Sequence, residues 1–275
     1  MPPRRAIAFH KLHGAGNDFV FVDDRDETFP AGDRAWLAAL AARRTGIGCE
    51  GFGLLRRSDR ADVRLVFLNP DGGEADLCGN GTRCAALLAN RLAIAPPGLT
   101  IETAAGIVRA AVTDTGVRLE LPDATGLRPA WTLRLDGDDT ETVGSIDTGV
   151  PHAVIAVPDP AAVDVDRRGR RVREHAAFDP TGTNVNFVGP ATARGLPMRT
   201  YERGVEAESG ACGTGAVAVA IVMAARGATT PPVTLLTAGG FCLEVDFTPL
   251  PGGATGVSLT GPAAYVYGGT LDYGD

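Results

Sequence analysis

The sequence repeats itself at a single offset. The motif LCGNG at residues 77–81 returns as ACGTG at residues 211–215, and the motif TIETAAG at residues 100–106 returns as TLLTAGG at residues 234–240. Both pairs lie 134 residues apart. Two different motifs that share one offset indicate an internal duplication, because chance matches would have no common spacing. We therefore expect two copies of one structural unit, each supplying one cysteine.

The chain has room for two such units. It contains 275 residues, of which 44% are hydrophobic, so each half can bury an ordinary core. Proline, aspartate, glycine and threonine gather at residues 122–129, which indicates a boundary there. The sequence therefore predicts an N-terminal half over residues 1–122 and a C-terminal half over residues 123–263.

Composition and charge exclude several classes of protein. The longest apolar run, residues 216–225, is half of the roughly 20 residues that span a bilayer. Residues 6–11 lack the apolar core of a secretory leader, and five cysteines, an odd number, do not suggest a disulfide framework. We therefore expect a cytoplasmic protein with reduced thiols and no membrane partner. The net charge of −7 argues against a nucleic-acid partner, and the basic cluster at residues 167–173 is predicted to be a solvated loop or helix edge.

Strand signals dominate the sequence. Apolar runs bounded by Gly, Pro and Asp lie at residues 7–9, 19–22, 63–68, 117–121, 154–157 and 257–259. Hairpins are expected at residues 104–106 and 238–240. Helices are expected after Asp33, which can cap one, and over residues 81–92 and 213–225, just after the cysteine motifs. This pattern predicts an α+β fold of two pseudo-symmetric halves, each a mostly antiparallel sheet around a central helix.

The two cysteine motifs suggest acid/base chemistry on one ligand. A cysteine at a helix N-terminus has its pKa lowered from about 8.5 to roughly 3.5–7.5, so its thiolate can act as a base. The neighbouring glycines let the backbone approach a ligand, and the N–H groups of Gly79, Asn80, Gly213 and Thr214 could together hold a carboxylate. Two thiols on opposite sides of such a ligand could remove a proton from one face of a carbon and return one to the other. That is stereoinversion by two bases.

The lysine content bears on the cofactor. An amino-acid Cα–H is weakly acidic, and many enzymes stabilise the carbanion with pyridoxal phosphate. The only lysine in the chain is Lys11, on an expected N-terminal strand without a phosphate-binding loop. A mechanism without a cofactor is therefore favoured, in which helix dipoles and N–H donors stabilise the enediolate-like intermediate.

Other interpretations of the same residues stay open. The motif GTGAVA at residues 213–218 fits a dinucleotide fingerprint, but the preceding residues are polar or small and not a buried parallel strand. A structural role for both cysteines leaves their flanking glycines unexplained, and a cysteine hydrolase using His152 leaves one motif without a purpose. Zinc is disfavoured because there is no C-x-x-C and the four histidines lack ligand spacing. The other cysteines, Cys49, Cys84 and Cys242, are predicted to be core residues.

Three longer motifs resemble those of a known family. They are HGAGNDF at residues 13–19, NPDG at residues 69–72 continuing through CGNGTRC at residues 78–84, and YERG at residues 201–204 continuing through ACGTG at residues 211–215. Together they resemble the signatures of diaminopimelate epimerase, and the resemblance covers almost the whole chain. It implies a cofactor-independent isomerase that interconverts LL- and meso-2,6-diaminopimelate in lysine and peptidoglycan precursor synthesis.

The resemblance also implies an architecture and a set of roles. The fold would have two pseudo-symmetric domains with the active site between them, a C-terminal tail, about residues 264–275, packing with the first domain, and a homodimeric state. Cys78 and Cys212 would be the acid/base pair, with His152 and Glu202 tuning them. The substrate would be held by Gly79, Asn80, Gly213 and Thr214 at its reacting end, and by Asn17, Asn69, Asn184, Glu202 and Arg203 at its other polar groups.

Two segments depart from the family pattern. Val150 precedes Pro151 and His152 where the family often has asparagine, and residues 46–53 lack the Asp-Gln or Asp-Gly pair common there. These changes concern substrate recognition more than catalysis. A racemase or epimerase of another amino acid is therefore the main alternative, and a non-catalytic amino-acid-binding protein is the alternative from a different class.

Overall fold

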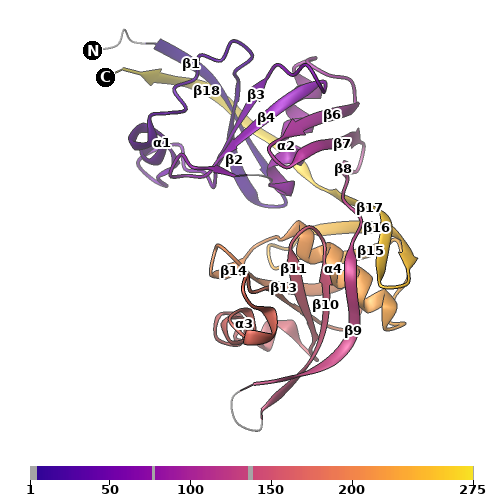
Figure 1. The fold of residues 1–275 in the computed structure, drawn as a ribbon. Helices are drawn as coiled ribbons and strands as arrows, with labels where there is room; N and C mark the ends of the chain where they lie inside the picture. The colour runs from indigo at the N-terminus through magenta and orange to yellow at the C-terminus, as the bar shows by residue number, and fades with distance from the viewer. Residues whose placement is uncertain (1–4, 76–77, 136–138, 275) are drawn as a thin grey trace. The chain divides into compact units, whose positions relative to one another are not determined.

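A computed structural model describes residues 5–75, 78–135 and 139–274. Residues 1–4, at the start of the region considered for a leader, and Leu77 of the first cysteine motif lie outside the described residues. The chain forms two compact units, which are described separately (Figure 1). Unit 1 combines residues 1–119 with residues 261–275, and unit 2 comprises residues 120–260.

Unit 1 is a mainly antiparallel sheet with two helices. Its strands are β1 (Arg5–Gly14), β2 (Asn17–Asp23), β3 (Phe52–Arg56), β4 (Val63–Leu68), β5 (Glu74–Ala75), β6 (Gly98–Thr103), β7 (Gly106–Thr113), β8 (Gly116–Glu120) and β18 (Ala263–Tyr273), and its helices are α1 (Arg34–Ala41) and α2 (Gly79–Arg91). The strand order is β18-β1-β2-β3-β4-β6-β7-β8, and β5 pairs with the end of β4. Only the pairs β2–β3 and β4–β6 are parallel among these.

Unit 2 repeats this plan. Its strands are β9 (Thr125–Arg134), β10 (Thr140–Asp147), β11 (Pro151–Ala156), β12 (Asn184–Val188), β13 (Leu196–Glu202), β14 (Ala207–Ser209), β15 (Val233–Leu236), β16 (Cys242–Leu250) and β17 (Gly253–Gly261), and its α-helices are α3 (Val165–Arg173) and α4 (Gly213–Ala225). Two 3₁₀ turns, Pro160–Ala162 and Ala176–Phe178, flank α3. The strand order is β9-β10-β11-β12-β13-β15-β16-β17, and β14 pairs with β13.

The two units share every pairing in this order. In unit 2 the parallel pairs are β11–β12 and β13–β15, at the places that β2–β3 and β4–β6 occupy in unit 1. The edge strands also correspond, since β18 lies antiparallel to β1 as β9 lies antiparallel to β10. The difference is in the chain order, because β9 directly precedes β10 in the sequence whereas β18 comes from the opposite end of the sequence to β1. The predicted duplicated α+β fold is confirmed.

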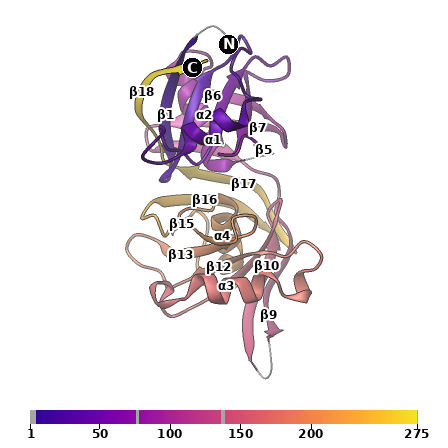
Figure 2. The ribbon, with the colours of Figure 1, turned by 90° about the vertical axis from the view of Figure 1, so that its left-hand side faces the viewer.

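Each unit is built around one central helix, as the sequence predicts. Helix α2 contacts β1, β2, β3, β4, β6, β7 and β18, and α4 contacts β9, β10, β11, β12, β15 and β16. Both helices have 13 residues, and nine residues of each helix are buried. Many of the buried residues are glycine or alanine, whose small size lets the surrounding strands pack closely against the helix (Figure 2). Helix α4 spans the predicted residues, but α2 begins at Gly79, two residues before the predicted start. The reason is that Cys78 caps it.

The outer helices cover one side of each core. Asp33 caps α1 by accepting a hydrogen bond from the Trp36 N–H at 3.1 Å, as predicted, and Leu37 then packs into the core of unit 1. In unit 2, α3 places Val165 and Val172 in the core. Within the described residues, no helix is long and apolar enough to cross a membrane.

The basic cluster at residues 167–173 is part of α3 and forms a helix edge, as the sequence predicts. Three of its five arginines, Arg168, Arg171 and Arg173, pair with acidic side chains of the same unit. Arg168 donates to both carboxylate oxygens of Glu141, at 2.6 and 2.8 Å, and Arg173 pairs with Glu206 at 3.0 Å. These pairs neutralise much of the positive charge, so α3 does not form a strongly basic surface.

Candidate active site

The two cysteines hold the same position at the start of the two central helices. Cys78 and Cys212 are both N-cap residues with extended backbone, at φ −127°, ψ 105° and φ −111°, ψ 110°. The Sγ of Cys78 accepts a hydrogen bond from the Gly81 N–H at 3.4 Å, and the Sγ of Cys212 accepts one from the Gly215 N–H at 3.4 Å. An N–H donor and the positive end of a helix dipole both stabilise a thiolate more than a thiol. The duplicated motif therefore gives both thiols the same backbone surroundings.

The glycines of the motif have two different uses. A Cβ on Gly81 would lie 2.6 Å from the Phe67 ring, and one on Gly215 would lie 2.4 Å from Oδ1 of Asn186, so close packing requires glycine at both positions. A Cβ on Gly79 would meet nothing within 4 Å. The first turn of a helix leaves its N–H groups without partners inside the helix. An open side at Gly79 therefore allows a ligand to approach these groups.

Unit 1 joins two of the predicted substrate-binding residues. Asn80, on the first turn of α2, donates from its amide nitrogen to Oδ1 of Asn17, at the start of β2, at 3.2 Å. Asn80 is 7% exposed and Asn17 is half-buried. Asn69 lies on the turn that joins β4 to β5, where its backbone accepts from the Gly72 N–H at 2.9 Å, and its side chain is exposed. Unit 1 thus groups Asn17 and Asn80 with Cys78.

Unit 2 buries His152 beside the helix that carries Cys212. His152 is 1% exposed, and its Nδ1 lies 3.1 Å from Nδ2 of Asn186. An amide nitrogen only donates, so Nδ1 accepts and the ring carries its proton on Nε2. Among the described residues, Nε2 has no hydrogen-bond partner. Burial, with a smaller contribution from the charge of Arg203, lowers the pKa of His152 to about 3, so the ring is neutral at physiological pH.

Three of the five residues predicted for the other polar groups of the substrate, Asn184, Glu202 and Arg203, lie in unit 2. Oδ1 of Asn184 accepts from the backbone N–H of Arg203 at 2.9 Å, and its amide nitrogen donates to the Pro151 carbonyl at 3.2 Å. The Arg203 guanidinium donates to the Thr181 carbonyl at 3.3 Å. Burial raises the pKa of the neighbouring Glu202 carboxyl. Asn184 therefore connects the start of β11, the strand that carries His152, to the segment that carries Arg203.

Thr214 contacts both Cys212 and Thr148, which lies on the turn between β10 and β11. Its hydroxyl is 3.5 Å from Sγ of Cys212, and its carbonyl accepts from the Thr148 hydroxyl at 3.4 Å. The first turn of α4 is therefore held to the β10–β11 turn next to the thiol. In unit 1, the residue 134 positions before Thr148 is Gly14, where a Cβ would lie 2.6 Å from the Asn80 carbonyl.

Asn186 is a site residue that the sequence reasoning missed. It is fully buried and its amide is satisfied on both sides, donating to the Ala153 carbonyl at 3.0 Å and accepting from the Thr200 hydroxyl at 2.9 Å. It holds His152 in one tautomer and lies against Gly215. The signal was the alternation in β12, where Asn184 and Asn186 are two residues apart and share one face of a strand.

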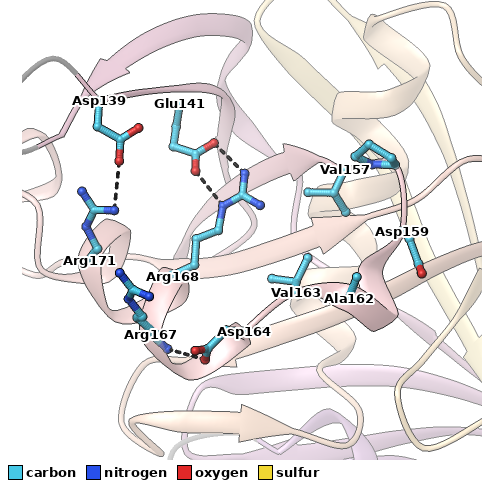
Figure 3. A pocket seen from close by; sticks show the side chains of 11 residues that line it. Asp139, Glu141, Val157, Asp159, Ala162, Val163, Asp164, Arg167, Arg168 and Arg171 are labelled. Carbon is cyan, nitrogen blue, oxygen red and sulfur yellow. Dashed lines mark hydrogen bonds and ion pairs between the residues drawn. The ribbon is translucent and has the colours of Figure 1, made fainter.

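A pocket of about 510 Å³ lies elsewhere in unit 2, against α3 (Figure 3). Its charged side chains largely pair with one another, for example Asp139 with Arg171 at 3.0 Å and Glu141 with Arg168 at 2.6 Å. None of the predicted site residues lines it. Within the described residues, no cluster of three or more His, Cys, Asp or Glu side chains could hold a metal ion.

Solved structures share this fold. A phenazine biosynthesis protein of Bacillus anthracis matches with a TM-score of 0.72 at 16% identity, covering 97% of this chain and 99% of that one. A hydroxyproline epimerase from Agrobacterium vitis, solved with trans-4-hydroxy-L-proline, matches with a TM-score of 0.66 at 18% identity, covering 100% and 95%. These likenesses place the chain in one fold class with both proteins.

The sequence comparisons identify the family within this class. A family model for diaminopimelate epimerase matches residues 9–125 and 144–265. The diaminopimelate epimerase of Aquifex aeolicus is 40% identical over 96% of this chain and 98% of its own length, and that of Methanocella arvoryzae is 37% identical over 97% of each. The chain belongs to the diaminopimelate epimerase family.

Proposed function

We propose that this protein is an isomerase that interconverts LL- and meso-2,6-diaminopimelate without a cofactor, by acid/base catalysis with two cysteines. Membership of the family supports the reaction. The observation that carries the mechanism is the duplicated cap, in which Sγ of Cys78 and Sγ of Cys212 each accept a helix N–H at 3.4 Å. Two equivalent thiols suit a reaction that must work from both faces of one carbon.

In this mechanism one cysteine is a thiolate and the other is a thiol. The thiolate takes the proton from the α carbon, and the electron pair of that C–H bond moves into the carboxylate to give an enediolate-like intermediate. The thiol then gives its proton to the opposite face of the carbon. One turnover exchanges the protonation states of Cys78 and Cys212, so the reverse reaction starts from the opposite state.

The first turns of α2 and α4 would stabilise the intermediate. The backbone N–H groups of Gly79, Asn80, Gly213 and Thr214 are in the first turn of each helix, where N–H groups and the helix dipole favour a developing negative charge. The reacting carboxylate would be held by these N–H groups. Cys78 and Cys212 are the proposed catalytic residues, with His152 and Glu202 tuning the thiols.

The other end of the substrate would be read by polar groups. Arg203 suits the distal carboxylate because a guanidinium can donate two parallel hydrogen bonds, and Glu202 suits the distal ammonium group. Asn184 supports this assignment by binding the Arg203 backbone at 2.9 Å. Asn17 and Asn69 would complete the contacts. We further propose a cytoplasmic homodimer that serves lysine and peptidoglycan precursor synthesis.

A second candidate is an epimerase or racemase of another amino acid. Val150 stands where the family often has asparagine, so one side-chain amide near His152 is missing. The loss concerns recognition and leaves both thiols in place. The two candidates differ in substrate and not in chemistry.

The test is stereochemical turnover in D₂O. The purified protein is incubated separately with LL-diaminopimelate, proline, histidine and glutamate, and deuterium at Cα is followed together with the appearance of the other stereoisomer. We expect one deuterium at the inverted centre of diaminopimelate and none in the other amino acids. Exchange with proline, histidine or glutamate alone would favour the second candidate, and no exchange with any of them would contradict the proposed function.

A further inference from the structure

Arg83 is a buried cation on the helix that begins at Cys78. It is 0% exposed, and among the described residues no carboxylate pairs with it. Its Nη2 donates to Oδ1 of Asn80 at 2.6 Å, whereas Nε and Nη1 have no hydrogen-bond partner. A buried charge without a counter-ion is costly to a fold, so its presence suggests a use other than packing. The equivalent position in unit 2, 134 residues later, is the apolar Val217.

Arg83 is one end of a chain of hydrogen bonds. Its guanidinium donates to Asn80, Asn80 donates to Asn17 at 3.2 Å, and Asn17 donates from Nδ2 to the carboxylate of Glu50. Glu50 is itself held by Arg43, at 3.3 Å. The chain crosses the predicted substrate-binding residues of unit 1, and it ends on a glutamate in the segment of residues 46–53 that departs from the family pattern.

The chemistry of the two ends fixes the direction of the chain. A guanidinium can only donate hydrogen bonds, and a carboxylate can only accept them. A 180° flip of an asparagine side-chain amide exchanges the positions of its oxygen and its nitrogen. Neither Asn80 nor Asn17 therefore determines by itself which of its two atoms faces Arg83. With Arg83 at one end and Glu50 at the other, the oxygen of each amide must face Arg83 and each nitrogen must face Glu50.

We propose that Arg83 and Glu50 are positioning residues that together set the direction of the Asn80 and Asn17 amides in the Cys78 half-site. This inference rests on the proposed function, because it concerns how that site presents itself to its substrate. The Asn17 amide uses one N–H for Glu50 and offers the second to a ligand. That group is a donor, so the ligand group that it suits is a carboxylate oxygen and not an ammonium group.

The charge of Arg83 has a second effect in the same place. Burial lowers the pKa of the Arg83 guanidinium, and the neighbouring Cys84 and Cys78 thiols act in the opposite direction. An arginine stays protonated in a protein, so it presents a fixed positive charge near Cys78. Val217, at the equivalent position in unit 2, carries no charge. The two cysteines therefore have similar backbone surroundings but different charges near their thiols.

Paired substitutions at Glu50 test the direction of the chain. Glu50→Gln can still turn an oxygen toward Asn17, whereas Glu50→Lys presents only donors and forces the amide to reverse. The Glu50 side chain is 50% exposed, so neither change should affect folding. We expect Glu50→Gln to bind diaminopimelate within about twofold of the unmodified protein, and Glu50→Lys to bind roughly tenfold more weakly by calorimetry. Asp59→Lys, an exposed charge reversal in the same unit, is the control for net charge.

A second pair separates the donor of Arg83 from its charge. Arg83→Gln and Arg83→Met are both neutral and similar in length, but only glutamine can donate to Oδ1 of Asn80. We expect kcat/KM for diaminopimelate to be at least tenfold higher in Arg83→Gln than in Arg83→Met. The loss from the unmodified protein to Arg83→Gln measures the charge, and it should be accompanied by an upward shift of the acidic limb of the pH–rate profile.

The outcomes separate this inference from the proposed function. If the unmodified protein incorporates deuterium but Glu50→Lys binds the substrate as tightly as Glu50→Gln does, the inference is wrong and the function stands. Equal kcat/KM in folded Arg83→Gln and Arg83→Met would also overturn it. Should Arg83→Met not fold, the Glu50 pair still decides. Failure of the unmodified protein to exchange deuterium counts against the proposed function. The comparison of substrate binding by Glu50→Gln and Glu50→Lys then tests the chain of hydrogen bonds without any measurement of turnover.

Discussion

At the scale of single residues, the two half-sites are alike in backbone and different in side chains. Both cysteines accept an N–H from the third residue of their helix at 3.4 Å. Around this common feature, unit 1 places the buried cation Arg83, whereas unit 2 places the neutral, buried His152. A two-base enzyme must hold one thiolate and one thiol at the same time, and unequal surroundings are one way to hold them. The following three predictions concern individual side chains.

Replacing either thiol should stop inversion. Cys78→Ala and Cys212→Ala each remove one of the two acid/base groups, so we expect racemisation and epimerisation to fall below detection. The serine variants keep a hydroxyl of similar size, but a hydroxyl is a much poorer base, so only slow exchange is expected. Measured turnover of either alanine variant at the unmodified rate would rule out the two-base mechanism. Circular dichroism of each variant controls for folding.

His152 should make stability fall in acid. Burial lowers the pKa of His152 to about 3 from its usual 6.5, so the unfolded chain binds this proton more readily than the folded chain does. Its contribution to stability is present above about pH 6.5 and is lost as the pH falls toward 3, by up to about 1.4 kcal/mol per pH unit. His152→Gln keeps a polar side chain without this titration. Urea unfolding between pH 7 and 4 should show a shallower loss in the variant, and parallel curves would contradict the assignment.

Arg203 should determine how well the distal carboxylate is bound. Its loss would leave that carboxylate buried without a partner, so Arg203→Met is expected to reduce kcat/KM for diaminopimelate by roughly a hundredfold or more. The thiols should react with iodoacetamide as before. Arg194→Met, which removes an exposed arginine of the same unit, is the control. If kcat/KM does not change, recognition does not depend on Arg203 and the second candidate function gains support.

At the scale of elements, the central helices determine where the chemistry is placed. The third residue of both α2 and α4 is a glycine, Gly81 or Gly215. A side chain there would collide with Phe67 in unit 1 and with Asn186 in unit 2, so the cap geometry depends on glycine. The same glycine lets the Sγ of the cap residue reach the backbone N–H. The repeated motif therefore specifies a helix start, and the residues packed against it specify which partner the thiol meets.

Gly215→Ala should disturb unit 2 through Asn186. The added Cβ would lie 2.4 Å from Oδ1 of Asn186, which must move and release its hydrogen bonds to His152 and Thr200. We expect a loss of about 1–3 kcal/mol in the free energy of unfolding, as for other overpacked cores. Gly79→Ala is the control for stability, since its Cβ would meet nothing within 4 Å. Equal stability of the two variants would contradict this packing argument.

The sequence predicted the repeated elements well because their signals are local. The 134-residue offset, the helix after each cysteine and the hairpins at residues 104–106 and 238–240 all follow from short motifs. The links among side chains were harder to predict. Glu50 and Asn186 acquire their roles from partners that lie far away in the sequence, Asn17 for Glu50 and His152 for Asn186. A pattern of period two or 3.6 shows which face a residue lies on, but not what it contacts there.

At the scale of the whole molecule, the duplication is completed in two different ways. Unit 2 takes its edge strand, β9, from the residues directly before β10. Unit 1 takes the corresponding strand, β18, from the far end of the chain, and β18 pairs along β1 from Arg5↔Tyr273 to Gly14↔Ala263 with one register shift between Lys11 and Leu12. Closing this pairing costs more loop entropy than a local hairpin does. Unit 1 therefore cannot complete its sheet until the last strand is present, whereas unit 2 can.

This difference predicts that damage to β18 will affect unit 1 selectively. Leu271 is 8% exposed and packs with Ile7 and the rest of the unit 1 core, so Leu271→Ala should lower the stability of that unit by about 2–4 kcal/mol. Thr270→Ala, at the exposed neighbouring position, is the control. Hydrogen exchange should become faster at the amides of β1 and stay unchanged at those of β10, because β18 pairs with β1 whereas β10 pairs with β9 and β11. Faster exchange in both β1 and β10 would mean that the two units unfold together. The two repeated units would then be separate in fold but not in stability.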